Sequence, residues 1–362
     1  MSALKARIVD LIGALGPLPV SEYMATCLSD PQHGYYMTRD PFGRDGDFTT
    51  APEISQMFGE LIGAWLADSW TRLGSPRDAI IAEIGPGRAA LMKDIVRTLA
   101  RIAPALRDNA RFVLVETSEK LARAQAETLE ASGGRFEWVA HAGALPPGPL
   151  LVVANELFDA IPIRQYVRTA AGWRERMVAL DDRDELVFAA GSGSLDPTLL
   201  PHDAASAPEG AIVELAPARS ALMQALAERL AAQGGVGLFI DYGYTRAAVG
   251  DTLQALLKHR YDDPLAHPGE ADITAHVDFA ALAAVARAAG LSAHLTTQGE
   301  FLLALGLRER AARLGAQADA ALRQRLAGEV DRLAGAEAMG TLFKVLAVAA
   351  PGLPLAGFPP PA

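Results

Sequence analysis

The sequence AIIAEIGPGRAAL, residues 79–91, decides the fold of this chain. Its apolar run contains the acidic residue Glu83 near its end, and a Gly-Pro-Gly loop follows at 85–87. Short apolar runs bounded by glycine are typical of buried parallel strands, and glycine leaves space where a ligand approaches the backbone. A helix starting near Ala89 would direct free N–H groups and the positive end of its dipole at the same place. The stretch therefore predicts a strand, a ligand-binding loop and a helix.

Similar apolar runs recur along the chain, and helical segments lie between most of them. They occupy residues 79–84, 111–116, 135–140, 149–155, 235–243, 291–297 and 341–350. This alternation predicts an α/β fold with a doubly wound, mainly parallel sheet. The last run follows a charged helix, and we expect it at an edge of the sheet. The arginine-rich segment 308–326 is interpreted as a solvated helix face.

Two regions, residues 1–75 and 162–215, fall outside the alternation. Residues 162–215 contain shorter strand-like pieces, which indicate a subdomain inserted after the fourth strand. We expect five parts, which are an N-terminal helical section with a lid loop (1–75), a first part of the core (76–161), the inserted subdomain (162–215), a second part of the core (216–351) and a disordered tail (352–362).

Composition excludes several classes of protein. The 362 residues include 33 basic and 43 acidic side chains, a net charge of −10, which argues against nucleic-acid binding as the main activity. Cys27 is the single cysteine, so there is no internal disulfide or thiolate metal cluster, and the histidines lack metal-ligand spacing. No run approaches about 18 apolar residues. We expect a cytoplasmic protein that binds no metal and does not insert stably into a membrane.

The glycine loop alone leaves two cofactors open. Residues 85–90 match G-x-G-x-x-A, the dinucleotide fingerprint, so NAD is one candidate. S-adenosylmethionine is favoured by Glu83, which can receive an amine, and by Glu116, which ends the next strand and can bind ribose hydroxyls. The late pair of strands is typical of methyltransferases. In the alternative interpretation, Glu83 and Glu116 only end strands at the surface.

Ordered sequence blocks from about Ser21 to Pro351 identify a resemblance that covers nearly the whole chain. They include GDFTTAPEISQMFGELIGAW, EIGPGRAALMKDIVR, VETSEKLARAQAETL, ANELFDAIPIRQY and PGEADITAHVDF. The chain resembles the MidA-like family of S-adenosylmethionine-dependent methyltransferases. The resemblance implies a Rossmann-like class I methyltransferase core of seven strands, with an N-terminal helical section and an inserted α+β subdomain. It also implies an arginine of a protein partner as acceptor, since a mitochondrial member is implied to methylate a respiratory complex I subunit.

One departure from the family concerns the glycine loop. The family loop usually reads G-P-G-R-G-T, whereas this chain has Ala89 and Ala90 at the last two positions. Alanine is small and favours helix, so we expect cofactor binding to survive.

The segment ANELFDAIP, residues 154–162, supplies the candidate catalytic residues. Asn155 and Glu156 end the fourth strand, and Asp159 follows three residues later. On the first turn of a helix, residues three apart share a face, so Glu156 and Asp159 would form a two-acid clamp for a guanidinium, which is always charged at neutral pH. Helix capping by the same acids is an equally good interpretation.

The loop GDFTTAPEIS, residues 46–55, is interpreted as a lid. Asp47, Thr49 and Thr50 are expected at the cofactor and Glu53 at the acceptor. A threonine N-cap with proline in the first turn explains Thr50 without a ligand. Asp241 ends the fifth strand, where it binds the acceptor or anchors the turn.

The residues together predict a methyltransferase acting on a protein arginine. The expected cofactor site consists of Glu83, Gly85, Pro86, Gly87, Glu116, Asp47, Thr49 and Thr50. Three alternatives remain open: a methyltransferase with a small-molecule acceptor, a non-catalytic assembly chaperone, and an NAD-dependent oxidoreductase.

Overall fold

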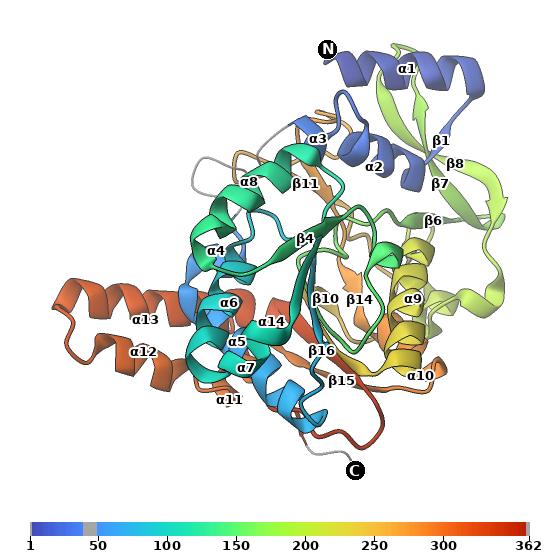
Figure 1. Ribbon diagram of the computed structural model, residues 1–362. Coiled ribbons are helices and arrows are strands. Elements are labelled where there is room, and N and C mark those ends of the chain that lie inside the picture. Colours follow the sequence, from blue (N-terminus) through green and yellow to red (C-terminus); the bar gives the residue numbers. More distant parts are fainter. Residues whose placement is uncertain (1, 39–48, 360–362) are drawn as a thin grey trace. The chain divides into compact units, whose positions relative to one another are not determined.

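The apolar runs of the sequence form the central sheet of the computed structural model, which describes residues 2–38 and 49–359 (Figure 1). The parallel strands are β2 (Ile80–Ile84), β3 (Arg111–Val115), β4 (Phe136–Val139), β5 (Leu150–Asn155) and β10 (Gly235–Tyr244). Their carboxyl ends meet at one edge of the sheet, where ligands bind in open α/β folds. The predicted strands and their mainly parallel arrangement are confirmed.

The two late strands join this sheet in an unexpected order. The strand order is β15-β16-β10-β5-β2-β3-β4, with β15 (Ser292–Thr297) and β16 (Phe343–Ala349) antiparallel. The prediction that 341–350 lies at an edge is wrong, because β16 lies between β10 and β15. Apart from Lys344, its side chains are apolar on both faces and buried, as an interior strand requires. One further short strand is counted with the sheet off this order, so the count of seven strands is not confirmed.

The chain divides into two compact units, which we name the core unit and the insert unit. The core unit consists of Thr49–Leu157, Leu222–Thr245 and Phe279–Ala362, and contains the central sheet. The insert unit consists of Met1–Phe48, Phe158–Ala221 and Arg246–Asp278. The N-terminal section and the segment inserted after β5 therefore belong to the same unit. The five-part organisation expected from the sequence stays a prediction.

Helices flank the central sheet in the core unit, apart from α12 (Leu307–Gly315) and α13 (Ala320–Ala334), which project away from it as a pair (Figure 1). The others are α4 (Ala51–Ile54), α5 (Gln56–Arg72), α6 (Ala90–Ile102), α7 (Pro104–Asn109), α8 (Glu119–Leu129), α10 (Phe279–Ala288), α11 (Gln298–Ala304) and α14 (Met339–Leu342). Helix α9 (Pro217–Gln233) precedes β10. Trp65 of α5 packs in one apolar cluster with Ile81, Leu114, Val153 and Val345 of the strands. This cluster holds the strand ends that carry the site.

The insert unit is built on antiparallel strands. Its larger sheet has five strands, β1 (Leu18–Pro19), β6 (Arg164–Thr169), β7 (Gly172–Leu180), β8 (Leu186–Ser194) and β9 (Ile212–Leu215), in the order β1-β7-β6-β9 with β8 paired to β7. A smaller sheet joins β12 (Arg260–Asp262), β11 (Gln254–Leu257) and β13 (Asp272–Thr274), and β14 (Val277–Asp278) follows. Helices α1 (Ala3–Leu15) and α2 (Val20–Ser29) bury Leu4, Ile8 and Tyr23 in the same cluster as Val178 and Ile273. Helix α3 (Tyr35–Thr38) adds Tyr35 to this cluster.

Two further expectations are corrected by the packing. The segment 308–326 is not one solvated helix, because it forms α12 and α13, and Arg310 makes a partly buried ion pair with Glu60. Residues 352–359 differ from the expected disordered tail, since the Trp65 indole N–H donates to the Ala356 carbonyl at 3.0 Å and Phe358 packs on Phe301. Among the described residues, no helix is long and apolar enough to cross a membrane.

Candidate cofactor and acceptor site

The glycine loop after β2 has backbone angles that only small residues adopt easily. The φ angles of Gly85 and Gly87 are +68° and +53°, in the left-handed region. The Gly85 N–H donates to the Val115 carbonyl of β3 at 3.1 Å, which fixes the loop against the neighbouring strand. A Cβ at Gly85 would lie 2.9 Å from Leu157 Cδ1, so a larger residue there would require the Leu157 side chain to shift. Pro86 and these glycines form a fixed cradle at the carboxyl end of β2.

Ala89 shares this left-handed conformation, with φ of +60°, immediately before α6. A left-handed backbone costs an alanine about 1–2 kcal/mol. This cost is the structural consequence of the departure from the family loop at this position, where glycine would adopt the conformation without strain.

Glu83 of β2 is a buried carboxyl with an incomplete set of partners. Only 3% of its surface is exposed, and the Met92 backbone N–H is its hydrogen-bond donor. Its Oε2 atom has no hydrogen-bond partner in the described part of the chain. Burial raises the pKa of Glu83 to about 8, which the Met92 hydrogen bond only partly opposes. A buried carboxyl in this state is suited to receiving a cationic group.

Glu116, which directly follows β3, is held by a network that the sequence did not reveal. Its Oε1 accepts from the Ser118 N–H at 2.7 Å, and its Oε2 accepts from Gln125 Nε2 at 3.0 Å. Gln125 Nε2 also donates to the Gly87 carbonyl at 2.9 Å, while its Oε1 accepts from Trp138 Nε1 at 2.9 Å. Burial raises the pKa of Glu116. Gln125 thus ties the carboxylate to the glycine loop, as a positioning residue of the site.

The strand end at Asn155 and Glu156 carries the second group of polar atoms. Glu156 has φ of +52°, a strained conformation for a non-glycine residue, and its N–H donates to the Ile240 carbonyl at 2.8 Å. Its Oε1 accepts from Asn155 Nδ2 at 2.9 Å and from the Ala51 N–H at 3.3 Å. Asn155 Oδ1 is buried and has no partner among the described residues. Strain of this kind is concentrated at functional sites.

The prediction that a helix starts after Asn155 is wrong. Residues 156–163 form bends and turns, and the left-handed backbone of Glu156 is incompatible with a first helical turn. The shared-face argument for Glu156 and Asp159 therefore does not apply. Asp159 belongs to the insert unit, is buried, and its Oδ1 accepts from the Ala160 N–H at 2.8 Å.

A buried arginine holds the chain around Asp159. Arg219 is 1% exposed and donates to the carbonyl oxygens of Asp159 at 3.0 Å, Ile161 at 3.0 Å, Ala275 at 3.1 Å and His276 at 2.7 Å. Sequence reasoning missed this residue, since an arginine among alanines and serine reads as a surface position. Its role is structural, because it satisfies four backbone acceptors at once.

The lid segment is described only in part. Asp47 lies outside the described residues. Thr50 caps α4, with Pro52 in the first turn and a capping box in which the Thr50 N–H donates to Glu53 Oε2 at 3.4 Å. The capping interpretation of Thr50 is confirmed, and Glu53 takes part in it. Thr49 precedes the cap without regular structure. The ligand roles of these residues stay predictions.

Asp241 lies in β10, one residue beyond the pairing of Ile240 with Asn155. It is fully buried and accepts from the Tyr242 N–H at 2.9 Å. The described residues contain no group of three or more His, Cys, Asp or Glu that could hold a metal ion.

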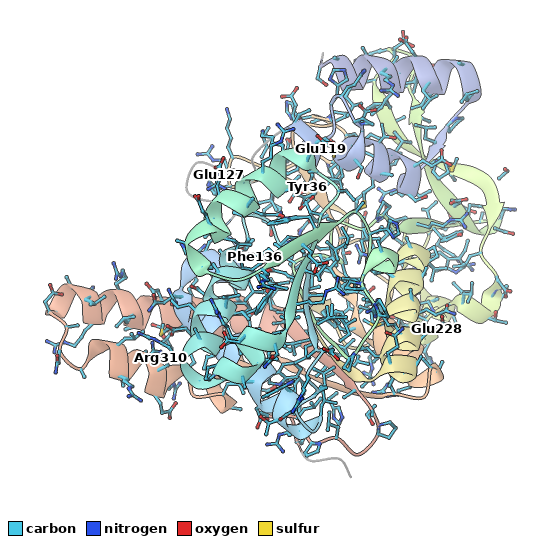
Figure 2. The ribbon with its side chains drawn as sticks, in the orientation of Figure 1. Tyr36, Glu119, Glu127, Phe136, Glu228 and Arg310 are labelled. Carbon is cyan, nitrogen blue, oxygen red and sulfur yellow. The ribbon has the colours of Figure 1, made fainter. Side chains whose placement is uncertain are left out.

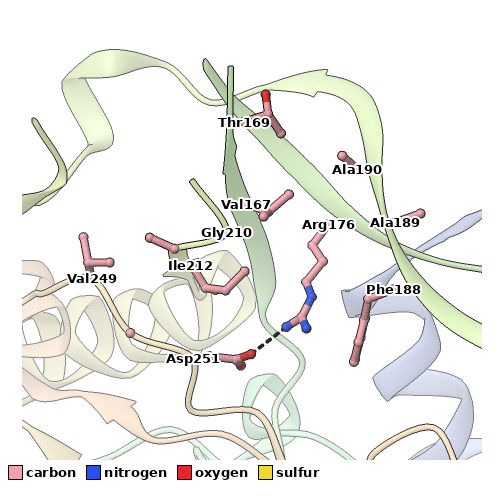
Figure 3. Close-up of a pocket in the computed structure, with 12 residues that line it drawn as sticks. Val167, Thr169, Arg176, Phe188, Ala189, Ala190, Gly210, Ile212, Val249 and Asp251 are labelled. Atoms are coloured by element: carbon pink, nitrogen blue, oxygen red, sulfur yellow. Dashed lines mark hydrogen bonds and ion pairs between the residues drawn. The ribbon is translucent and has the colours of Figure 1, made fainter. Parts of the chain in front are cut away.

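A cavity of about 520 Å³ in the insert unit contains none of the predicted site residues (Figure 3). Arg176 crosses it to pair with Asp251 at 2.8 Å, and its guanidinium lies 3.6 Å from the ring centroid of Phe188. The charge is thus already balanced within the cavity wall, which leaves mostly apolar surface for a ligand.

The strand ends of the core unit suit a ligand that combines donors and an anion. Glu83 Oε2 and Asn155 Oδ1, which have no partner among the described residues, belong to the neighbouring strands β2 and β5. Both oxygens can accept a hydrogen bond from an amine or a hydroxyl. The glycine loop and the N-terminus of α6 suit a carboxylate, and Glu116 suits ribose hydroxyls. These features fit S-adenosylmethionine, which carries an amine, a carboxylate and a ribose.

Comparison with known proteins gives the same family throughout. Residues 61–297 match the family model described as "Putative S-adenosyl-L-methionine-dependent methyltransferase". The mitochondrial protein arginine methyltransferase NDUFAF7 homolog of Drosophila melanogaster is 34% identical over 374 residues, covering 95% of this chain and 83% of the relative. NDUFAF7 of Homo sapiens is 33% identical, covering 93% and 81%. A protein of Burkholderia thailandensis, crystallised with S-adenosyl-homocysteine, is 31% identical with a TM-score of 0.82 and covers 98% of this chain and 93% of its own.

These findings confirm the resemblance read from the sequence blocks and the S-adenosylmethionine cofactor. They contradict the expectation of a cytoplasmic protein, because the curated relatives are named as mitochondrial.

Proposed function

The chain belongs to the MidA-like family of S-adenosylmethionine-dependent methyltransferases, and on this premise we propose that it methylates an arginine side chain of a protein partner. The relatives named as protein arginine methyltransferases support this acceptor. The resemblance extends the proposal to a subunit of respiratory complex I. The proposal covers Asp47, Thr49 and Thr50 at the cofactor and Glu53 and Asp241 at the acceptor.

One observation carries the proposal. Glu156 has a strained backbone at the carboxyl end of β5, and its Oε1 accepts from Asn155 Nδ2 and from the Ala51 N–H. Two donors on one oxygen keep the carboxylate from rotating. A fixed carboxylate pairs with a guanidinium, which is a permanent planar cation. Asp159 stays our candidate for a second catalytic acid.

The residues would act mainly by positioning. S-adenosylmethionine, when bound, supplies an electrophilic methyl group on a sulfonium. Glu83 would hold its amine, Glu116 its ribose, and the glycine loop its carboxylate. Glu156 would accept a hydrogen bond from one guanidinium nitrogen, and this contact would direct a second nitrogen towards the reacting carbon. The Glu156 carboxylate would also take up the proton that the guanidinium loses.

The test is transfer to an isolated protein complex. Purified protein is incubated with isotopically labelled S-adenosylmethionine and isolated respiratory complex I, and digests are searched for a mass increase on arginine. We expect Glu156→Gln to lower the rate by about 100-fold or more, with S-adenosylhomocysteine affinity unchanged. Glu119→Gln, an exposed carboxyl on α8, is the control and should keep full activity.

Three results would contradict the proposal. Label on lysine or on small molecules alone would indicate another acceptor. Full activity of Glu156→Gln would remove the residue from the chemistry. Normal S-adenosylhomocysteine binding without transfer to any protein fraction would favour the non-catalytic assembly chaperone.

A further inference from the structure

A cavity of about 400 Å³ lies in the core unit among α5, α6 and α12. Four arginines line it, Arg97 and Arg101 from α6 and Arg310 and Arg313 from α12 (Figure 2 shows Arg310). Such a concentration of positive charge is unusual in a chain whose net charge is −10. Part of the wall is apolar, with Leu61 and Ile102 as its larger side chains, and the Ile102 side chain is exposed.

Two of the four arginines are neutralised within the wall. Arg310 binds Glu60 through both Nε at 2.7 Å and Nη2 at 3.0 Å. Arg97 lies 3.3 Å from the Glu60 carboxylate and 3.0 Å from Asp94 Oδ1. Glu60 and Asp94 therefore offset two positive charges.

Arg101 and Arg313 have no such partners in the described part of the chain. No described residue forms an ion pair or a hydrogen bond with either guanidinium. The cavity thus carries an excess of about two positive charges, from side chains that are free to bind a ligand. Guanidinium groups bind phosphate and carboxylate oxygens through paired N–H donors.

Helix stability alone does not explain the arrangement. Arg101 and Arg313 occupy the last turns of α6 and α12, where a cation interacts favourably with the helix dipole by about 0.3–1 kcal/mol. This effect needs neither a shared cavity nor an apolar wall. Both helices instead direct their unpaired arginines to the same concavity.

We propose that this cavity is a second ligand site, which binds a phosphate-bearing small molecule with an apolar body. The phosphate dianion would lie between Arg101 and Arg313 and match their excess charge, while Leu61 and Ile102 contact the apolar body. A volume of this size lies within the range of small-molecule sites. Arg101 is twelve residues along α6 from Ala89, about 18 Å at 1.5 Å per residue, so the site is separate from the glycine loop.

The test uses 1-naphthyl phosphate as the probe in calorimetry with the full chain at low salt. Inorganic phosphate and 1-naphthol are the partial probes. We expect 1-naphthyl phosphate to bind more tightly than either, and the double variant Arg101→Gln/Arg313→Gln to weaken it by about tenfold or more. Arg308→Gln, an exposed arginine of α12 outside the cavity, should bind as the natural protein does. Saturation with S-adenosylhomocysteine should leave the affinity unchanged.

A further variant separates the two halves of the site. Ile102→Asn should weaken the binding of 1-naphthyl phosphate but not the binding of inorganic phosphate. Because Ile102 is exposed, the substitution should not unfold the protein. Absence of binding at millimolar probe, equal binding by the double variant, or displacement by S-adenosylhomocysteine would each overturn the proposal. Binding of an acidic peptide without binding of the phosphate probe would overturn it in favour of a protein-docking surface.

Discussion

Substituting Glu83 tests how the protein receives the amine of its cofactor. With a pKa of about 8, the buried carboxyl is about nine-tenths protonated at pH 7 in the free protein. A cation placed beside an acid lowers its pKa by about 1–3 units. Binding of S-adenosylhomocysteine, which carries the same ammonium group, should then release between about 0.4 and 0.9 of a proton at pH 7.

Calorimetry measures this release directly. The observed binding enthalpy at pH 7 is plotted against the ionisation enthalpy of several buffers, and the slope gives the number of protons released. In Glu83→Gln the slope should fall to nearly zero. The affinity should fall by about 10–100-fold, because a hydrogen bond to a charged group contributes about 1.5–3 kcal/mol.

The same pKa sets a pH dependence of stability in the free protein. The folded state binds a proton at Glu83 more tightly than the unfolded state, whose pKa is 4.5. Stability is therefore lost as pH rises from about 4.5 to about 8, by up to about 1.4 kcal/mol per unit. The difference in free energy of unfolding between Glu83→Gln and the natural protein, measured in urea, should therefore shift in favour of the variant as pH rises from 6 to 9.

Glu137→Gln is the matched control, since this carboxylate forms an ion pair with Arg111 that is almost half exposed. It should keep the full proton release and affinity. A slope that persists in Glu83→Gln, or no proton release by the natural protein, would refute the assignment of the amine to Glu83.

Three further predictions concern stability, each measured by urea unfolding. Ala89→Gly should change the free energy of unfolding by less than about 1 kcal/mol, because relief of the left-handed backbone offsets the lost methyl group. Ala90→Gly, inside the helix, should cost about 1 kcal/mol. A loss larger than about 1 kcal/mol in Ala89→Gly would contradict the strain argument. Arg219→Met should cost at least about 3 kcal/mol, since four carbonyls lose their guanidinium donor, although the Asp159 carbonyl keeps the Ala275 N–H. Near-neutral behaviour would show that water replaces the guanidinium. Trp65→Phe should cost at least about 1 kcal/mol, because it removes the hydrogen bond to the Ala356 carbonyl and leaves buried space unfilled. If a chain ending at residue 351 were as stable as the full chain, the tail would contribute nothing.

The parallel strands were predictable because burial on both faces leaves a direct mark in the sequence. Short apolar runs such as 79–84 and 149–155, which are bounded by glycines and helical segments, have few interpretations other than buried strands. The position of β16 within the sheet was not predictable in the same way. An edge strand and an antiparallel interior strand differ in their neighbours, and those neighbours come from distant parts of the chain.

The candidate site was predictable where a residue's role depends on its own strand. Glu83, Gly85 and Gly87 are placed by β2 alone, so the loop was read correctly. Gln125 could not be found, because its function depends on atoms of Gly87, Glu116 and Trp138 that only the fold brings together. The helix expected after Asn155 failed for a related reason, since the left-handed Glu156 is imposed by its surroundings and not by local propensity.

The interior place of β16 has a consequence during synthesis. Its residues, Phe343–Ala349, leave the ribosome after almost all of the chain, yet they pair with β10, which ends at Tyr244. At about 5–20 residues per second, the 105 residues between Tyr244 and Ala349 take roughly 5–20 s to translate. Throughout that interval one side of β10 has unpaired N–H and C=O groups beside an apolar surface, which is a template for aggregation. The newly made chain should therefore need a chaperone until its final strand arrives.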